Sequence, residues 1–208
     1  MISEKAKKLI LNFEGLDQPV KWPGGNSGIS MGHGYDLGSV SEEEFEFDWR
    51  YYLSADQMER LKKAIGVSGQ RAKILAPQFS DIKIRLQDAD EVFLEKTLPK
   101  FERITKTSFP ESEQLPEDAF GALISLVYNR GGDTSNTDRR KEMYEIKRVI
   151  TYLYGFGKEP SPEDLGSGLQ AIADLIRSMK RLWEGQNLGG LLRRRDAEAA
   201  LVESCIGG

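Results

Sequence analysis

The segment GISMGHGYDLG (residues 28–38) constrains the fold of this chain more than any other stretch. It contains four glycines, Gly28, Gly32, Gly34 and Gly38, and glycine weakens the interiors of both helices and strands. We therefore expect a short strand segment interrupted by glycine, where the backbone bends sharply and a bulky ligand can approach it. A purely structural β-hairpin is the simpler interpretation of the glycines alone.

Helical patterns flank this segment on both sides. Apolar residues recur at helical spacing over residues 3–14, where Ser3 can cap the start and Gly15 can end the helix. Ser41 precedes three glutamates, which favour the positive end of a helix dipole, and Ser54 begins a capping-box pattern. Two helices are therefore predicted after the glycine segment.

From about residue 87 onward the sequence is almost wholly helical in pattern. The segment 117–129 is apolar nearly all round, which predicts a buried central helix. Further patterns predict helices and a loop around it: amphipathic helices over 138–153 and 169–183, a loop over 158–168 between them, and a last helix over 191–204.

These patterns predict an α+β fold that is mostly α, in a single domain spanning residues 1–208. A small β-containing lobe is expected at about 15–60. The larger helical lobe is expected at about 61–208, together with the N-terminal helix. A length of 208 residues fits one domain with two lobes.

Composition and charge exclude several classes of function. The net charge of −4 disfavours a general nucleic-acid binder, which needs a basic face. With one cysteine and one histidine, the chain cannot form an intrachain disulfide, and we expect neither a metal nor another cofactor. No apolar run has the length of a signal peptide or a membrane span. We expect a monomer made in the cytoplasm that does not insert into membranes.

Glu14 is the first candidate for chemistry. It lies at the C-terminal end of the first predicted helix, where the helix dipole is negative, and its neighbours Phe13 and Leu16 are apolar. Both features favour the protonated carboxyl, which is the form that can donate a proton to a glycosidic oxygen. A surface glutamate at a helix end is the alternative interpretation.

Ser30 and Asp36 supply a hydroxyl and a second carboxylate from the glycine segment. Their even spacing on a strand-like stretch places both on one face if no bulge intervenes. Such groups can hold or activate a water while another carboxyl protonates the leaving oxygen, as glycoside hydrolysis requires. A phosphate-binding loop is the rival interpretation, but no Lys-Ser/Thr pair follows the glycines.

Four blocks of the sequence resemble the phage-type lysozymes, which are glycoside hydrolase family 24-like, and most closely the pesticin-like branch of wall-degrading toxin and endolysin domains. The blocks are NFEG (12–15), GISMGHGYDLG (28–38), ALISLVYNRGG (122–132) and GLLRRRDAEAAL (190–201). The resemblance implies a lysozyme-like fold. It also implies an inverting muramidase, which hydrolyses the β-1,4 bond between N-acetylmuramic acid and N-acetylglucosamine in peptidoglycan.

The resemblance also implies roles for individual residues. Glu14 matches the general acid and Asp36 the second carboxylate, for which Asp17 is the alternative. Ser30 stands where the family has a threonine that helps to position the attacking water, so the hydroxyl is kept and the methyl that fixes its rotamer is lost. His33, between two glycines, is either an exposed turn residue or a sugar contact.

Further substrate contacts are implied in the helical part of the chain. Asn129 matches an amide that contacts sugar in the family, and it follows Tyr128. Arg130, Arg194 and Arg195 are weaker candidates, and either of the last two can instead pair with the glutamate one turn on.

Two other functions remain open at this point. The chain could be a non-catalytic lysozyme-like module that binds wall glycan, because position 30 is Ser and no acid lies between Trp22 and Ser30. It could also be a lytic transglycosylase, which needs no residue to hold water. The basic segment 191–200 is either an anion-facing patch or a solvated helix face.

The biological setting follows from the implied activity. The expected partner is the peptidoglycan glycan strand, with an immunity protein if the chain is a secreted effector. The chain would act in the periplasm or on the cell wall after delivery by a secretion system or a holin. The sequence leaves open whether it is an endolysin or an effector, and whether it is a fragment of a larger protein.

Overall fold

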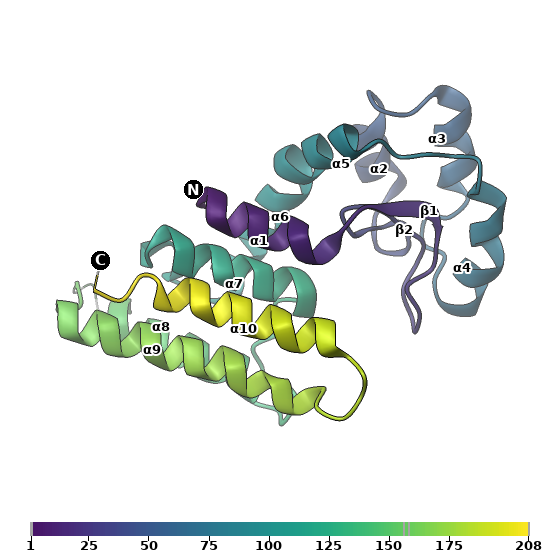
Figure 1. Cartoon of the computed structure of the whole chain (residues 1–208). Helices are drawn as coiled ribbons and strands as arrows, with labels where there is room; N and C mark the ends of the chain where they lie inside the picture. The colour runs from purple at the N-terminus through teal and green to yellow at the C-terminus, as the bar shows by residue number, and fades with distance from the viewer. Residues whose placement is uncertain (1, 156, 158, 208) are drawn as a thin grey trace. The chain divides into compact units, whose positions relative to one another are not determined.

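The computed structural model describes residues 2–155, 157 and 159–207. The fold is α+β and mostly helical, with a three-stranded antiparallel sheet (Figure 1). Two compact units can be distinguished. We call Glu14–Pro99 the sheet unit, and the described residues before Glu14 and after Pro99 the helical unit. The sheet unit is longer than the lobe expected at about 15–60, because helices beyond residue 60 share its core.

The sheet unit contains three strands and four α-helices. The strands, in the sheet order β1-β2-β3, are β1 (Asp17–Lys21), β2 (Ser30–Gly32) and β3 (Tyr35–Asp36). The helices are α2 (Glu42–Trp49), α3 (Ala55–Lys62), α4 (Gly69–Leu75) and α5 (Leu86–Val92). Short turns of 3₁₀ helix lie at Leu37–Ser39 and Ala76–Phe79, and a π-helical turn follows α5 at Phe93–Thr97.

The glycine segment folds as a hairpin. Gly32 and Gly34 take positive φ values of 59° and 76° around the turn that joins β2 to β3. Gly28 and Gly38 instead pack on each other, since a Cβ built on Gly28 would lie 2.3 Å from the amide nitrogen of Gly38. The expectation that these two glycines admit a ligand is wrong, because protein backbone occupies the space.

The core of the sheet unit lies between the hairpin and its helices. Tyr35 and Trp49 meet edge to face, with ring centroids 5.6 Å apart, and both are buried. The predicted caps are confirmed: the Ser41 hydroxyl accepts a hydrogen bond from the backbone of Glu44, and Ser54 forms a capping box at the start of α3. Local sequence thus places these helices, and burial of their apolar faces holds them.

The helical unit is built around α7. Its helices are α1 (Glu4–Glu14, whose last residue begins the sheet unit), α6 (Leu98–Ser108, which starts in the sheet unit), α7 (Glu117–Arg130), α8 (Lys141–Tyr154), α9 (Pro162–Ser178) and α10 (Gly189–Glu203), with 3₁₀ turns at Ser112–Gln114 and Met179–Leu182. Every residue of α7 from Ala119 to Val127 is buried, which confirms the predicted central helix.

Several helix boundaries in this unit differ from the prediction, and the start of α9 differs most. The helix predicted over 138–153 begins at Lys141, and the helix predicted over 169–183 ends at Ser178. Residues 162–168, expected to belong to a loop, form the first turns of α9. Ser161 accepts a hydrogen bond from the backbone of Asp164, and Pro162 occupies the first turn, where its missing N–H costs nothing. Lys158, the first residue of that predicted loop, lies outside the described residues.

Gly121 sets how closely α1 packs on α7. A Cβ at this position would lie 2.2 Å from the Cβ of Ala6, which is fully buried in α1. We expect Gly121→Ala to lower the free energy of unfolding by about 1–3 kcal/mol, because the helices must move apart. Gly166→Ala is the matched control: its new Cβ has no neighbour closer than 3.8 Å, so a gain of about 0.5–1 kcal/mol is expected. Urea denaturation measures both, and equal stabilities for the two variants would contradict the packing.

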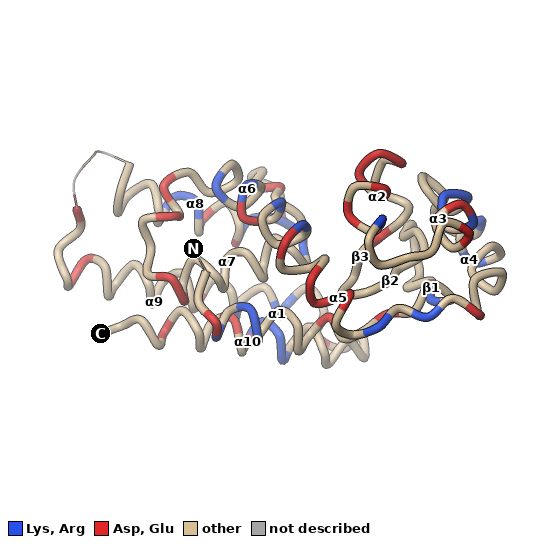
Figure 2. The backbone as a smooth tube through the Cα atoms, turned by 90° about the horizontal axis from the view of Figure 1, so that it is seen from above, with Lys and Arg blue, Asp and Glu red and all other residues tan. Residues whose placement is uncertain are grey.

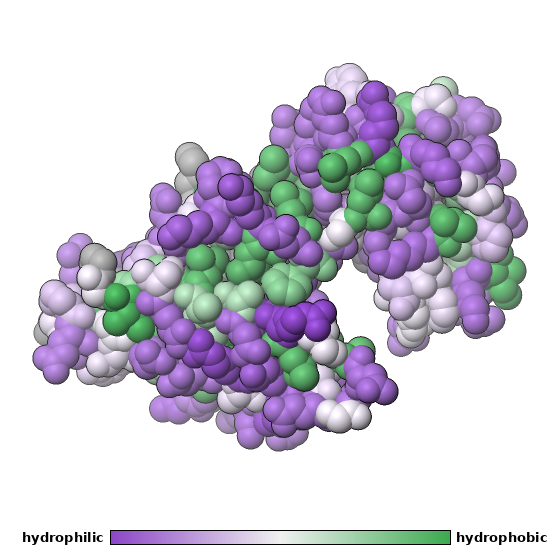
Figure 3. Space-filling view, in the orientation of Figure 1, coloured by the Kyte–Doolittle hydropathy of each residue, from purple (hydrophilic) through white to green (hydrophobic). Residues whose placement is uncertain are grey.

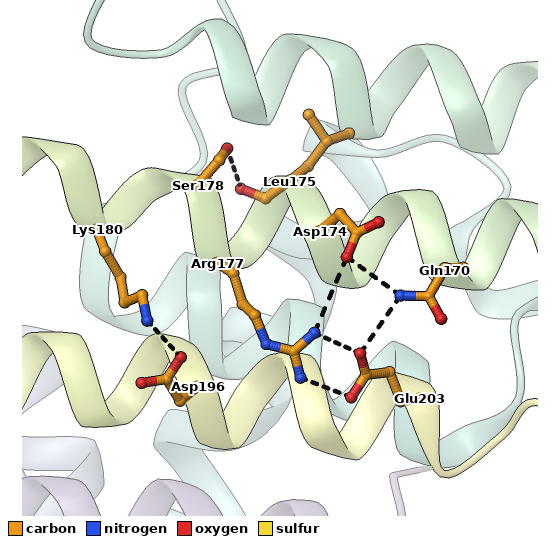
Figure 4. A network of polar contacts seen from close by, with 8 residues as sticks. All are labelled: Gln170, Asp174, Leu175, Arg177, Ser178, Lys180, Asp196 and Glu203. Carbon is orange, nitrogen blue, oxygen red and sulfur yellow. Dashed lines mark hydrogen bonds and ion pairs between the residues drawn. The ribbon is translucent and has the colours of Figure 1, made fainter.

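Ion pairs join α9 and the 3₁₀ turn that follows it to α10 (Figure 4). Arg177 donates to Glu203 with an Nη2–Oε2 distance of 2.6 Å, and Lys180 pairs with Asp196 at 2.7 Å. Because these groups are partly exposed, such pairs contribute little to stability, and they act mainly to align the two helices.

Charged residues are spread unevenly along the backbone (Figure 2). The first turn of α2 carries Glu42, Glu43 and Glu44, which suits the positive end of its helix dipole. Hydrophilic residues cover much of the face seen in Figure 3, with apolar residues between them. Across residues 2–155, 157 and 159–207, the structure contains no helix of the length and apolarity that a membrane crossing needs.

Candidate active site

Glu14 lies where the sequence predicts it, at the C-terminal end of α1. Gly15 follows with a φ of 66°, a conformation that glycine adopts readily, and turns the chain into β1. The Glu14 side chain is half-buried. Glu14 therefore comes three residues before the first strand of the sheet in the sequence.

Asp17 and Ser30 form a buried hydroxyl–carboxylate pair. The Ser30 hydroxyl donates to Oδ2 of Asp17 at 2.5 Å, and the two residues are 4% and 7% exposed. The other carboxylate oxygen of Asp17 pairs with the ammonium group of Lys21. The pair connects β1 and β2, which are adjacent and antiparallel with an irregular register between Asp17 and Lys21. The sheet thus fixes a carboxylate and a hydroxyl three and sixteen residues after Glu14 in the sequence.

Asp36 lies on the next strand and directly opposes Ser30 in the register of β2 and β3. The two residues occupy neighbouring strands of a hairpin, not one strand as the even spacing suggested. Both carboxylate oxygens of Asp36 accept backbone N–H groups: Oδ1 from Gly38 at 2.8 Å and Oδ2 from Gly28 at 3.3 Å. Asp36 therefore caps the 3₁₀ turn after β3 and holds the two ends of the glycine segment together.

His33 is buried, so the expectation of an exposed turn residue is wrong. Its Nδ1 lies 2.6 Å from the carbonyl oxygen of Gly15, and its Nε2 lies 2.7 Å from Oδ1 of Asp90. The two ring nitrogens thus contact a backbone carbonyl on one side and a carboxylate on the other. The ring also meets Phe93 edge to face. His33 thereby ties the backbone just after Glu14 to α5.

The candidate sugar contacts lie at the end of α7 in the helical unit. Tyr128 meets Phe101 edge to face, with ring centroids 4.5 Å apart. The side-chain oxygen of Asn129 accepts a hydrogen bond from Nη2 of Arg195 at 3.1 Å. Arg130 is half-buried and follows Asn129 at the helix end. The amide is thus held in one orientation by an arginine of α10.

Arg194 and Arg195 do not form an anion-facing patch. Both are buried, and both pair with Glu198, as the spacing allowed. Ser125 of α7 also donates to Glu198, at 2.6 Å. Burial lowers the pKa of Arg195, and the charge of Glu198 opposes that shift. These groups form an internal polar network between α7 and α10, and the segment 191–200 is not simply a solvated helix face.

The candidate residues therefore fall into two sets, each within its own unit. Glu14, Ser30, His33 and Asp36 belong to the sheet unit, and Tyr128, Asn129 and Arg130 belong to the helical unit. Asp17, ranked below Asp36 from the sequence, is the carboxylate that contacts Ser30.

Sequence patterns did not predict Asp90, which contacts His33, or Ser125, which binds Glu198. Neither has a local signal. The separations of 57 and 73 residues mean that only the folded chain brings these groups together.

Comparison with known proteins gives one family match. Residues 16–109 match the family described as Domain of unknown function (DUF8812). The matched segment covers less than half of the chain, and it contains the whole sheet, including Asp17, Ser30 and Asp36, but begins two residues after Glu14. No curated protein matches the sequence.

Proposed function

We propose that this chain is a peptidoglycan muramidase with a lysozyme-like fold, which hydrolyses the β-1,4 bond between N-acetylmuramic acid and N-acetylglucosamine. The observation that carries the proposal is the hydrogen bond from Ser30 to Asp17 on the strands that follow Glu14. A carboxyl at a helix end, a second carboxylate and a hydroxyl are the groups that acid-catalysed attack of water on a glycoside requires.

Each of the three groups has one task in this reaction. Glu14 donates its proton to the glycosidic oxygen as the bond to the anomeric carbon breaks. The Ser30 hydroxyl donates its hydrogen bond to Asp17, so the lone pairs of its oxygen remain to accept a hydrogen bond from water. As that water attacks the anomeric carbon, its proton passes to Asp17 through or beside Ser30. Glu14 is left ionised and Asp17 protonated. Exchange with solvent then removes the proton from Asp17 and returns one to Glu14.

Asp17 is the better of the two candidates for the second carboxylate. Both carboxylates have both oxygens engaged, but the partners differ. Asp17 contacts two side chains, one of them the hydroxyl that positions water, whereas both oxygens of Asp36 accept backbone N–H groups that shape the hairpin. Moving a water proton onto Asp36 would compete with these two hydrogen bonds and weaken the cap of the turn after β3. In this proposal Asp36 supports the hairpin and Asp17 does the chemistry.

The Ser30–Asp17 pair also favours hydrolysis over the two alternatives. A lytic transglycosylase closes the muramic acid ring on itself and needs no group to hold water. A module that only binds glycan needs no buried carboxylate beside a hydroxyl, since an unreactive polar contact would serve. The hydroxyl of Ser30 can still position water, because the hydrogen bond to Asp17 fixes its rotamer. In the family's threonine the methyl group would do this.

Digestion of purified peptidoglycan tests the proposal. The soluble products are separated and their ends are identified by mass spectrometry. We expect muropeptides with reducing muramic acid ends. Anhydromuramic acid ends would identify a transglycosylase, and binding to the insoluble wall without any soluble product would identify a glycan-binding module.

The setting proposed for this activity is the bacterial wall. The chain would act in the periplasm or on the wall as an endolysin or as an antibacterial effector domain, after delivery by a holin or a secretion system. An effector would require an immunity protein in the producing cell, and deletion of its gene would then be lethal only while Glu14 is intact.

A further inference from the structure

A cationic pocket lies in the helical unit. Its volume is about 240 Å³, and it is lined by Asn129, Arg130, Arg139, Arg140, Trp183 and Leu191. These residues come from the end of α7, the segment before α8, the segment after Met179–Leu182, and α10. Three of the lining residues are arginines and none is acidic.

The acidic groups near these arginines are engaged elsewhere. Glu142 and Asp138 both pair with Arg181. Asp133 reaches only Nε of Arg140, at 3.6 Å, and accepts from the backbone of Ser135. These carboxylates therefore balance the three arginines only in part: Asp133 pairs with Arg140, and the charge of Glu142 opposes the lowering of the pKa of Arg130.

Several guanidinium nitrogens are buried without a hydrogen-bond acceptor in the part of the chain that the structure describes: Nε and Nη1 of Arg130 and Nη1 of Arg140. Nη2 of Arg130 donates to the backbone carbonyl of Arg139 at 2.7 Å, which fixes the orientation of the group. Buried donors without acceptors cost free energy, so an anion that accepts from them would be bound favourably.

The electrostatics of Arg130 point the same way. Burial, followed by the neighbouring charges of Arg140 and Arg195, lowers the pKa of Arg130 to about 10. The charged form is therefore disfavoured in this environment, and a bound anion would relieve that cost. The guanidinium of Arg130 also lies over the ring of Trp183, 5.1 Å from its centroid, which holds it in place.

The volume of the pocket and the residues that line it indicate which class of ligand it can bind. The pocket is smaller than the about 300–1,000 Å³ of typical small-molecule sites, so it suits a small group and not a nucleotide. Trp183 and Leu191 add apolar wall to the arginines. This mixture fits an alkyl group that carries a carboxylate better than a hydrated inorganic ion.

We propose that this pocket binds an organic carboxylate, and that in peptidoglycan this is a carboxylate of the peptide stem on muramic acid. The identity of the stem as ligand rests on the muramidase function proposed above. Asn129, the candidate sugar contact, forms part of the pocket wall, so a glycan held by its amide would bring an attached peptide close to the arginines.

Calorimetric titration of the full chain tests the pocket without any need for turnover. The ligands are N-acetylmuramyl-L-alanyl-D-glutamate, which has two free carboxylates, its diamide, and inorganic phosphate. We expect the diacid to bind at least about tenfold more tightly than the diamide, since charge-assisted hydrogen bonds to arginine are lost in the amide. Phosphate is expected to bind more weakly than the diacid.

Matched variants locate the binding. Replacing Arg139 and Arg140 together with Gln should abolish the preference for the diacid over the diamide. Arg148→Gln, which removes an exposed charge from α8, should retain it. If the double variant fails to fold, Arg139→Gln alone should weaken the diacid and leave the diamide unchanged, because the Arg139 side chain is exposed.

The possible results separate this proposal from the enzymatic one. Equal binding of diacid and diamide, phosphate binding as tight as the diacid, or an unchanged preference in the arginine variants would overturn the pocket. If the chain digests peptidoglycan but shows no carboxylate preference, the muramidase stands and the pocket fails. If it binds the diacid but digests nothing, the carboxylate pocket stands and the muramidase fails.

Discussion

Glu14→Gln is expected to lower the rate of muropeptide release from peptidoglycan by about 100- to 10,000-fold, which is the range that a general acid contributes. The amide has nearly the shape of the carboxyl but has no proton to give to the glycosidic oxygen. Glu14 ends α1 and is half-buried, so the change removes the acid without disturbing the helix. Release of soluble muropeptides per unit time measures the effect.

Glu4→Gln is the matched control for this variant. Glu4 is exposed at the other end of the same helix, where it pairs with Lys7. Its loss should leave the rate unchanged. Both variants should unfold at denaturant concentrations close to that of the parent chain. If Glu14→Gln keeps the parent rate, Glu14 is not the acid and the proposed site must be abandoned.

The second large effect separates Asp17 from Asp36. Asp17→Asn is expected to lower the rate by about 100-fold, because the amide cannot take up the proton of the attacking water. Asp36→Asn should stay within about fivefold of the parent rate, since the amide oxygen of asparagine can keep the cap from Gly38 and only the longer bond from Gly28 is lost. The same assay of muropeptide release compares the two variants at equal concentrations of folded protein.

Ser30 gives this comparison an internal check. Because its hydroxyl donates to Asp17, Asp17→Asn and Ser30→Ala should lower the rate by less in combination than the product of their single effects. A large loss for Asp36→Asn together with a small loss for Asp17→Asn would reverse the assignment. The second carboxylate would then be the one that the family resemblance implied.

The sequence was most informative where structure depends on neighbours in the chain. Ser41 and Ser54 were predicted to cap helices, and both do, because a cap needs only the backbone two or three residues ahead. The same rule explains the error at α9. Ser161 and Pro162 form a helix start, but the prolines and glycines around them favoured a loop.

Contacts across the fold could not be derived in this way. The Ser30–Asp17 hydrogen bond depends on an irregular register between β1 and β2, and a shift of one residue would have turned one side chain to the other face. His33 was expected on the surface because it lies between glycines, but its partner Asp90 comes from another helix.

The arginine pocket could not be predicted from the sequence either. Arg139 and Arg140 are adjacent in the sequence, which was a visible sign of local positive charge. What makes a site of them is the proximity of Arg130 and Trp183, which come from distant segments. Pairing of nearby acids with Arg181 is equally invisible until the helices are packed.

The central claim is that Glu14 protonates the leaving oxygen while the Ser30–Asp17 pair holds the water that attacks from the opposite face of the sugar. Proton NMR of the first products, recorded before the anomers interconvert, tests this directly. Attack on a β-glycosidic bond from the opposite face gives the α anomer, which is the predicted result. Initial formation of the β anomer, or of an anhydro product with no free anomeric centre, would contradict the account.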